Sequence, residues 1–224
     1  MNEEYALVVA GGKGTRINSE VPKQFLEVNG VPVLMHTINA FLSYSPSINI
    51  ILVLPENDMP RWESLCEAHR FTENVTLQSG GASRFQSVKR GLERIAGDGL
   101  VAVHDGVRPL VRKELIADTF ARAAAEGTGV AAVRPKESMR EDIGDTTRAL
   151  DRSRYWMVQT PQTFRISLLR EAYQLPEDPT LTDDASVVER YGYAISLVEG
   201  YYDNIKITTA EDLAVVEALL RKKS

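Results

Sequence analysis

Short apolar runs alternate with segments of helical periodicity along most of the chain. Five of these runs are expected to be strands, at residues 5–10, 48–55, 75–78, 100–104 and 130–134. Four segments between them place their apolar residues on one helical face, at residues 33–44, 61–69, 83–96 and 113–126. This alternation predicts an α/β protein with a mostly parallel, twisted sheet that is flanked by helices on both faces.

The pattern breaks between residues 135 and 154, where the chain is polar, rich in charge and without a core face. Because such a stretch is usually a functional excursion, we expect an arm that projects from the sheet at about residues 135–160. Beyond the arm, helices are predicted at 166–173 and 183–191, strands at 194–198 and 204–207, and a closing helix from Thr209. Residues 1–224 are predicted to form a single domain.

Two predicted helices begin with the spacing of a capping box. Ser83 pairs with Gln86 at the start of one, and Thr208 pairs with Glu211 at the start of the closing helix. Each pair is expected to satisfy backbone N–H groups of the first helical turn.

Charged residues mark two helix starts as well. Asp183 and Asp184 are expected to open the helix at 183–191, where acids suit the positive end of the helix dipole. Arg84 lies in the first turn of another helix, where a cation opposes that dipole. Its position indicates a nearby anion or carboxylate.

Composition narrows the possible functions. Apolar residues make up 43% of the 224 residues and charged residues 25%, as in an ordinary globular protein, and the net charge is −5. A general nucleic-acid binder would usually carry a broad basic face, so nucleic acid is not an expected partner. The lone cysteine, Cys66, excludes an intrachain disulfide or a thiolate metal cluster within one chain. With no leader-like start and no apolar run of membrane-spanning length, we expect a cytoplasmic protein without a membrane partner.

A glycine-dense loop with several cations follows the first predicted strand. Its residues are Ala10, Gly11, Gly12, Lys13, Gly14 and Arg16, and Pro22-Lys23 follows shortly after. Glycines let backbone N–H groups approach an anion closely, and the cations neutralise phosphate charge. The loop is therefore predicted to bind a polyphosphate.

Two common phosphate-binding templates do not fit this loop. The ATP/GTP P-loop needs Ser or Thr after Gly-Lys, but Gly14 follows Lys13. The dinucleotide fingerprint lacks its third glycine, because Ile17 occupies that position, and no acid ends a second strand about 20 residues later. A nicotinamide-dependent oxidoreductase is therefore disfavoured.

The remaining pattern, G-x-G-x-R…P-K, resembles the nucleotidyltransferases that join a nucleoside triphosphate to a phosphorylated substrate. Six later blocks are similar to the family of 2-C-methyl-D-erythritol 4-phosphate cytidylyltransferases. They are Gly80-Gly81-Ala82-Ser83-Arg84 with Ser87-Val88, Val103-His104-Asp105-Gly106-Val107-Arg108-Pro109, Asp151-Arg152, Gln159-Thr160-Pro161-Gln162-Thr163-Phe164, Thr182-Asp183-Asp184-Ala185-Ser186 and Asn204-Ile205-Lys206-Ile207-Thr208. These blocks span almost the whole chain in the family's order.

The resemblance implies a Rossmann-like sheet of the nucleotide-diphospho-sugar transferase type with a projecting dimerisation arm. It implies that CMP is transferred from CTP to 2-C-methyl-D-erythritol 4-phosphate, giving 4-diphosphocytidyl-2-C-methyl-D-erythritol and pyrophosphate in non-mevalonate isoprenoid precursor biosynthesis. Mg²⁺ is the implied cofactor, and a homodimer with arm exchange is the implied assembly. The chemistry agrees, because a phosphate monoester nucleophile is already anionic and the protein needs mainly to align two polyanions and stabilise charge.

For the nucleotide, the resemblance assigns the loop backbone and its cations. Ala10, Gly11, Gly12, Lys13 and Gly14 match positions at the triphosphate and base edge, and Arg16 and Lys23 match catalytic positions that stabilise the transition state. Gly81, Ala82 and Ser87 match the segment for the cytosine base and ribose. Because relatives can carry an acid in place of Ala82, only its backbone is expected to matter. Ser87 could also be a buried helix serine bonded to its own backbone.

Asp105 is the expected ligand of Mg²⁺. It directly follows a predicted strand, at the edge where open α/β sheets bind ligands, and Mg²⁺ prefers one or two carboxylates plus phosphate oxygens. Gly106 matches a neighbouring contact position at which relatives can have alanine, a change that we expect to be harmless.

For the acceptor, the resemblance assigns a set of hydroxyls and cations: Ser138, Arg152, Thr160, Thr182 and Lys206. Arg152 and Lys206 are also assigned as catalytic, because they supply charge. The family's arm reaches across a dimer, so Ser138 and Arg152 can serve the partner's site. Arg108 could bind substrate phosphate or pair with Asp105, and Lys206 could be an outward-facing strand residue.

Two alternative functions stay open. Ribitol-5-phosphate cytidylyltransferases share much of the pattern, although the Asp151-Arg152 pair and the block from Thr182 to Ser186 favour the methylerythritol acceptor. A non-catalytic nucleotide-sensing module is the alternative of another class. The intact Arg16, Lys23, Asp105 and Lys206 disfavour it.

Overall fold

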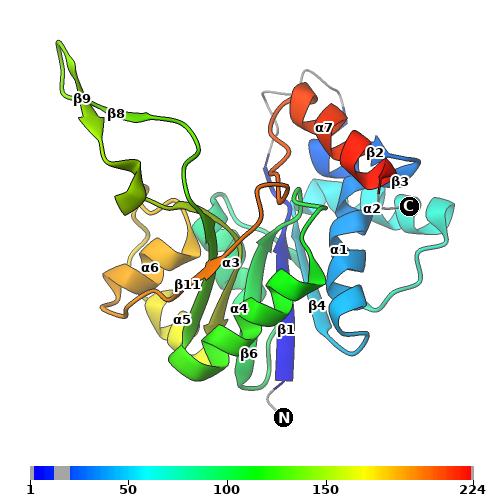
Figure 1. The fold of residues 1–224 in the computed structure, drawn as a ribbon. Helices are drawn as coiled ribbons and strands as arrows, with labels where there is room; N and C mark the ends of the chain where they lie inside the picture. Colours follow the sequence, from blue (N-terminus) through cyan, green and yellow to red (C-terminus); the bar gives the residue numbers. More distant parts are fainter. Residues whose placement is uncertain (1–2, 13–20, 223–224) are drawn as a thin grey trace.

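A seven-stranded sheet forms the centre of the structure (Figure 1). The computed structural model describes residues 3–12 and 21–222. In sheet order the strands are β11 (Leu197–Glu199), β7 (Thr128–Val133), β10 (Met157–Arg165), β6 (Gly99–Asp105), β1 (Glu3–Val9), β4 (Asn49–Leu54) and β5 (Val75–Ser79). Neighbouring strands are parallel except at β10, which runs antiparallel to both β6 and β7. The predicted α/β architecture is confirmed.

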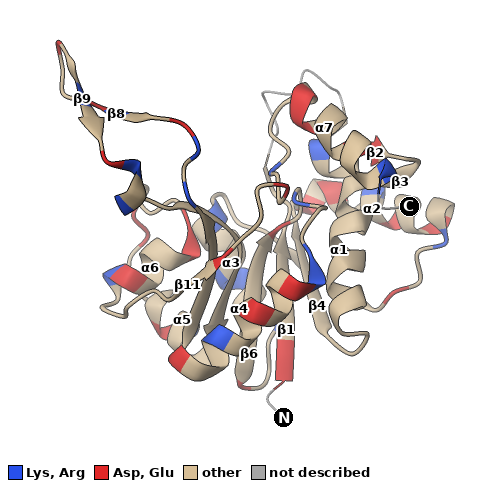
Figure 2. Ribbon diagram, in the orientation of Figure 1, with Lys and Arg blue, Asp and Glu red and all other residues tan. Residues whose placement is uncertain are grey.

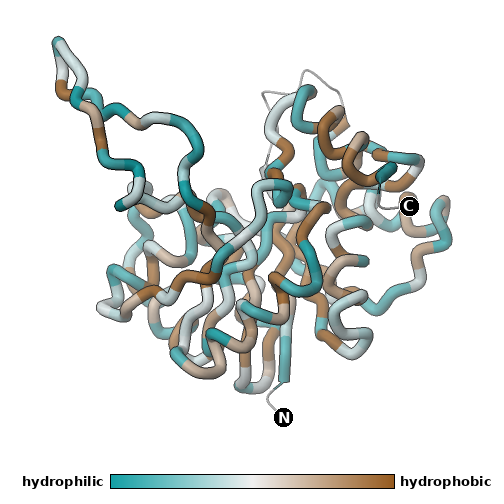
Figure 3. Tube along the Cα trace, viewed as in Figure 1, coloured by the Kyte–Doolittle hydropathy of each residue, from teal (hydrophilic) through white to brown (hydrophobic). Residues whose placement is uncertain are grey.

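Helices cover both faces of this sheet. Alternate residues of a strand point to opposite faces, so Ala6 and Val8 of β1 join one buried cluster, whereas Tyr5 and Leu7 join another. The first cluster includes residues of α1 (Val33–Tyr44), α2 (Met59–His69) and α4 (Lys113–Glu126). The second includes residues of α3 (Arg84–Leu92), α5 (Ile166–Ala172) and α6 (Asp184–Arg190). In Figure 3, hydrophobic stretches gather in the sheet and its helices, whereas the arm is mostly hydrophilic.

Strand β10 is the strand of the main sheet that the hydrophobic pattern did not predict. A proline inside an apolar run argues against a central strand, because it cannot donate to the ladder. The structure accommodates Pro161 where the pairing with β7 shifts register, between Val158 and Gln162. Residues 157–160, which the sequence analysis included in the arm, therefore lie in the sheet.

The predicted arm is a two-stranded hairpin. Strands β8 (Met139–Asp142) and β9 (Thr147–Leu150) pair antiparallel, and a short 3₁₀ helix, η3 (Arg152–Arg154), leads back towards the sheet. The hairpin extends away from the body of the molecule at the upper left of Figure 1. Charged residues of both signs lie along it (Figure 2).

A smaller buried cluster lies beside the main sheet. It joins α7 (Ala210–Arg221) to the short strand β2 (Glu27–Val28), which pairs with β3 (Val31–Pro32), and it includes Val107 and Ile207. The predicted strand at 204–207 is wrong. Its alternating isoleucines face this cluster, and Ile207 donates its N–H to the Val107 carbonyl, in the loop after β6 rather than in the sheet.

The helix starts agree with the sequence only in part. The Ser83 hydroxyl accepts the Gln86 N–H, as predicted, but the Gln86 side chain accepts the N–H of Ala82 instead of that of Ser83. The predicted pair Thr208 and Glu211 is wrong by one residue, because Thr209 caps α7 in a box with Asp212. Two further 3₁₀ helices are η1 (Lys23–Phe25) and η2 (Glu56–Asp58). Among the described residues, none of the helices has the length and apolar character needed to cross a membrane.

Candidate active site

A cavity of about 380 Å³ opens at the carboxyl ends of the parallel strands. These strands end at the same edge of the sheet, which is where open α/β sheets bind ligands. We call it the first cavity; its lining includes Ala10, Gly11, Gly12, Lys23, Gly81, Ala82, Ser87, Asp105 and Lys206. It thus brings together predicted nucleotide residues from three separate parts of the chain.

The glycine loop forms one wall of the first cavity. Ala10 donates its N–H to the Val53 carbonyl, which holds the start of the loop against β4. A methyl group built on Gly12 would lie 4.0 Å from Cε of Lys23, so the lysine side chain passes close to the loop backbone. Lys13, Gly14 and Arg16 lie outside the described residues.

The opposite wall is a tight turn held by Ser87. The Ser87 hydroxyl accepts the N–H of Gly81 at 3.1 Å and donates to the Ser83 carbonyl at 2.8 Å. A side chain on Gly81 would meet Gln86 at 2.3 Å, so the turn needs glycine there. Ala82 takes part through its backbone N–H, which donates to Gln86. Ser87 therefore bonds to the backbone of its own helix, at Ser83, and it also orders the turn through Gly81.

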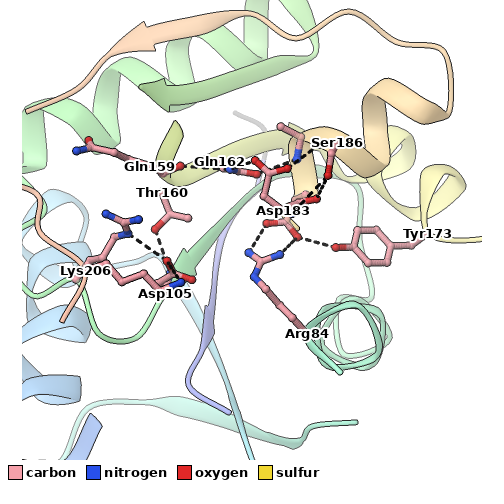
Figure 4. Close-up of polar contacts among 12 residues, drawn as sticks. Arg84, Asp105, Gln159, Thr160, Gln162, Tyr173, Asp183, Ser186 and Lys206 are labelled. Carbon is pink, nitrogen blue, oxygen red and sulfur yellow. Dashed lines mark hydrogen bonds and ion pairs between the residues drawn. The ribbon is translucent and has the colours of Figure 1, made fainter. Parts of the chain in front are cut away.

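Asp105 is buried between the cavities and paired with two cations. Its Oδ2 lies 3.1 Å from Nε of Arg108 and 3.1 Å from Nζ of Lys206, and its N–H donates to the Thr160 hydroxyl (Figure 4). Burial alone would raise the pKa of the Asp105 carboxyl, but Lys206, Arg108 and Arg84 together lower it well below its usual range. The carboxylate is therefore ionised at any physiological pH.

A second cavity, of about 210 Å³, lies on the other side of Asp105. Its lining includes Arg108, Thr160, Gln162, Thr182 and Lys206, and it shares Arg84, Asp105 and Lys206 with the first cavity. Most of the predicted acceptor residues of one chain thus meet here, from four segments that are distant in the sequence.

The structure shows the pairing considered for Arg108, whose contact with a substrate phosphate stays a prediction, and it excludes one alternative for Lys206. Arg108 pairs with Asp105 and donates to the Asn204 carbonyl at 2.8 Å. Lys206 is half-exposed, but its ammonium contacts Asp105, so it is not an outward-facing strand residue.

Gly106 is more constrained than expected. A methyl group built on it would lie 2.8 Å from Cβ of Ala10. An alanine at this position would require its neighbours to shift, so glycine suits the packing of this chain, and the expected backbone contact to a ligand stays a prediction.

The arm residues lie apart from both cavities of their own chain. Ser138 and Arg152 are exposed, and the Arg152 guanidinium donates to the Lys136 carbonyl. Arg152 lines a separate hollow at the base of the arm, together with Lys136 and Tyr202.

The sequence analysis did not recognise three residues that organise the site. Arg84 lines both cavities, Gln162 joins β10 to the start of α6, and Asn204 donates its side-chain amide to the Thr160 carbonyl. Gln162 and Asn204 lie in blocks that carried the family resemblance. For Arg84, a cation in the first turn of a helix already indicated a nearby carboxylate, and the structure shows that this is Asp184.

Asp105 could contribute one carboxylate to a magnesium ion whose other ligands are mainly phosphate oxygens of a bound substrate. Among the described residues, no group of three His, Cys, Asp or Glu side chains could hold a metal by itself. Asp105 supplies one ionised carboxylate beside a loop suited to phosphates, and Mg²⁺ commonly uses one or two carboxylates plus phosphate oxygens and water.

The chain is similar to known proteins over nearly its whole length. The profile of the IspD family, 2-C-methyl-D-erythritol 4-phosphate cytidylyltransferase, matches residues 5–222. A protein of that name from Porphyromonas gingivalis is 47% identical over 97% of this chain and 98% of its own length, and one from Phocaeicola vulgatus is 44% identical over 96% and 99%.

Solved structures agree with the sequence comparison. The crystal structure of 4-diphosphocytidyl-2C-methyl-D-erythritol synthase from Anaerococcus prevotii has a TM-score of 0.84 at 28% identity and covers 98% of this chain and 96% of its own. That of 2-C-methyl-D-erythritol 4-phosphate cytidylyltransferase from Thermus thermophilus has a TM-score of 0.80 at 32% identity, with 98% and 99% covered. The chain therefore belongs to the 2-C-methyl-D-erythritol 4-phosphate cytidylyltransferase family.

Proposed function

We propose that this protein transfers CMP from CTP to 2-C-methyl-D-erythritol 4-phosphate and releases pyrophosphate, as a step in isoprenoid precursor synthesis. The observation that carries the proposal is the pair of adjoining cavities that share Asp105 and Lys206. Two polyanionic substrates that react with each other need two sites that meet at a positively charged wall. Family membership names the two substrates.

The first cavity is proposed to bind CTP. The backbone at Ala10, Gly11 and Gly12 would face the triphosphate, and the turn at Gly81, Ala82 and Ser87 would face the base and ribose. Lys23, with Arg16 and Lys13 of the same loop, would neutralise phosphate charge. Asp105 would hold Mg²⁺, which supplies further positive charge against the triphosphate when it is bound.

The second cavity is proposed to bind the acceptor phosphate. Thr160 and Thr182 would orient it by hydrogen bonds, and Lys206 would hold it against the α-phosphate of CTP. The attacking phosphate oxygen is already anionic, so no general base is needed, and cations stabilise the charge that develops on the transferred phosphoryl group. Arg108 would act on this site through Asp105 and the Asn204 carbonyl, its two contacts.

Ser138 and Arg152 are proposed to complete the second cavity of a partner subunit. They lie at the base of the hairpin, Ser138 directly before β8 and Arg152 at the start of η3, and they line neither cavity of their own chain. A homodimer with exchanged arms would bring them to the partner's acceptor. We further propose that residues 1–224 form one domain with this arm and that the enzyme works in the cytoplasm.

Pyrophosphate release tests the proposed function. Purified protein with CTP, Mg²⁺ and 2-C-methyl-D-erythritol 4-phosphate should release one pyrophosphate for each CMP transferred, and EDTA should stop the reaction. Ribitol 5-phosphate, offered in parallel, should turn over far more slowly. Faster turnover of ribitol 5-phosphate would reassign the acceptor, and tight CTP binding without turnover of either acceptor would point to a nucleotide-sensing module.

A further inference from the structure

Arg84 lies in the wall between the two cavities and is paired with a carboxylate that lies behind that wall. It is the first residue of α3, next to the Gly81 turn, and it lines both cavities. Asp184, the first residue of α6, has no exposed surface in its side chain and is not among the residues that line either cavity.

The contact between them is a bidentate fork. Nη1 of Arg84, which is labelled in Figure 4, lies 2.9 Å from Oδ1 of Asp184, and Nη2 lies 2.6 Å from Oδ2. Such a fork fixes the relative orientation of the two groups as well as their distance. Burial alone would lower the pKa of Arg84, but the Asp184 carboxylate raises it well above its usual range. Arg84 is therefore charged at any physiological pH.

Tyr173 holds the same carboxylate from the side away from the cavities. Its hydroxyl donates to Oδ1 of Asp184 at 2.6 Å. Burial, and then the charge of Asp184, raises the pKa of Tyr173, so this hydroxyl remains a donor. Asp184 therefore has one partner at the cavities and another in the core beneath.

The start of α6 is also tied to β10. Gln162 donates to Oδ2 of Asp183 at 2.9 Å and accepts the N–H of Ala185 at 2.8 Å. Thr182, a proposed acceptor ligand at the rim of the second cavity, comes directly before this anchored pair. Arg84 adds a tie to buried Asp184, from the Gly81 turn of the first cavity to the rim of the second, beside the exposed hydrogen bond from Gln86 to Glu177.

We propose that Arg84 is a positioning residue that sets the distance between the two substrates, because its fork to Asp184 locks the Thr182 rim to the Gly81 turn. This inference rests on the proposed function of the two cavities. Each cavity alone needs only its own loop. In-line attack needs both loops at a fixed distance and orientation, because a displacement of the reacting groups by about 1 Å can lower the rate about a hundredfold.

Three variants separate positioning from simple stabilisation. Arg84→Lys keeps the charge but replaces the fork with a single contact. Asp184→Asn removes the charge of a residue that lines neither cavity. Tyr173→Phe is the matched control, because it removes a hydrogen bond to the same carboxylate but leaves the fork in place.

We expect each of Arg84→Lys and Asp184→Asn to raise the acceptor KM and to lower kcat. The value of kcat/KM for the acceptor should fall by about 10- to 100-fold. The KM for CTP should change by less than about threefold, because the Ser87 bond to Gly81 is untouched. Tyr173→Phe should lower Tm by about 2–4 °C without changing the acceptor KM. If Asp184→Asn does not fold, Arg84→Lys decides the question.

The inference is overturned if all soluble variants lose activity only in proportion to their loss of Tm, or if Arg84→Lys has wild-type kinetics. It is also overturned if Arg84→Lys raises the KM of CTP alone, since Arg84 would then be a nucleotide ligand. An inactive wild-type protein would instead refute the proposed function.

Discussion

The two cavities share a wall but are built in different ways. The first is lined largely by backbone and small side chains of two glycine-containing turns, each of which lies within a few residues of sequence. The second is lined by residues from the start of α3, from β6 and the loop after it, from β10, and from the segments before α6 and α7. The first could therefore be located from a local motif, whereas the second exists only after distant segments meet.

The difference extends to the way in which each cavity is held in shape. Hydrogen bonds between near neighbours, such as Ser87 to Gly81, order the first. Ion pairs between distant residues, Arg84 with Asp184 and Asp105 with Lys206, order the second and the shared wall. Charge near the second cavity should therefore matter for its geometry as well as for substrate affinity, and this contrast can be tested.

The largest effect is expected at the shared wall. Lys206→Gln removes the cation that contacts Asp105 and lines both cavities. We expect kcat/KM to fall by about a thousandfold for both substrates, because a preorganised charge at the reacting groups is lost. Steady-state pyrophosphate release measures it, with the exposed Lys113→Gln as the matched control. A loss confined to one substrate would assign Lys206 to one cavity only.

A smaller loss, confined to the acceptor, is expected at the arm. Arg152→Gln should raise the acceptor KM by about 10- to 100-fold through the loss of a charged hydrogen bond, and the CTP affinity should not change. Arg148→Gln on the same hairpin is the control, because its exposed ion pair with Glu141 should contribute little. An unchanged acceptor KM in Arg152→Gln would separate the arm from the second cavity.

Mixed dimers test whether the arm serves the partner. Lys206→Gln and Arg152→Gln are co-expressed so that mixed dimers form. If the arms are exchanged, each mixed dimer keeps one intact site, in which Lys206 of one subunit meets Arg152 of the other. Random pairing would then restore about a quarter of wild-type activity. The assay uses acceptor well below its KM. If Arg152 acts in its own subunit, every site carries a defect and the mixture is no more active than the two variants expressed separately.

A modest effect is expected on the nucleotide side. Ser87→Ala leaves the Gly81 N–H without its acceptor, so the CTP KM should rise by about 5- to 10-fold while the acceptor KM stays within twofold. Ser64→Ala is the control, since Ser64 also bonds its own helix but lines neither cavity. An equal change in the acceptor KM would mean that the two cavities are less independent than their construction indicates.

The last effect concerns stability beneath the shared wall rather than substrate binding. Burial lowers the pKa of His104, which directly precedes Asp105, to about 4. The unfolded chain takes up this proton near its ordinary pKa of 6.5 and the folded chain does not, so stability falls as the pH drops from 6.5 towards 4. The contribution is about 1.4 kcal/mol per pH unit inside that window. The free energy of unfolding, measured with urea between pH 6.5 and 4, should fall less steeply with pH in His104→Gln than in the wild type. Parallel curves for the two proteins would contradict the assignment to His104.

The elements that sequence predicted well are those that local patterning specifies. Strands β1, β4, β5, β6 and β7 and helices α1 and α4 follow from apolar periodicity, with ends displaced by no more than a few residues. Strand β10 was missed because Pro161 conceals it, and the segment 204–207 was assigned to the sheet because two alternating isoleucines face a different core.

The acids at the start of α6 show the same limit at the level of one residue. Both Asp183 and Asp184 suit the positive end of a helix dipole, and sequence treats them alike. In the structure Asp183 caps the helix, whereas Asp184 is fully buried against Arg84 and Tyr173. Their different roles depend on which side of the helix start faces α3.

Sequence by itself determined the alternating α/β pattern, the glycine loop, the existence of an arm and the family blocks, because each is carried by residues close together in the chain. Only the tertiary structure decided that Asp105 meets Lys206, that Arg84 meets Asp184, and that Ser138 and Arg152 stand away from their own cavities. The physical reason is that these contacts join segments that are far apart in the sequence. A contact across a hundred residues depends on how strands are ordered and helices packed, which no local spacing records.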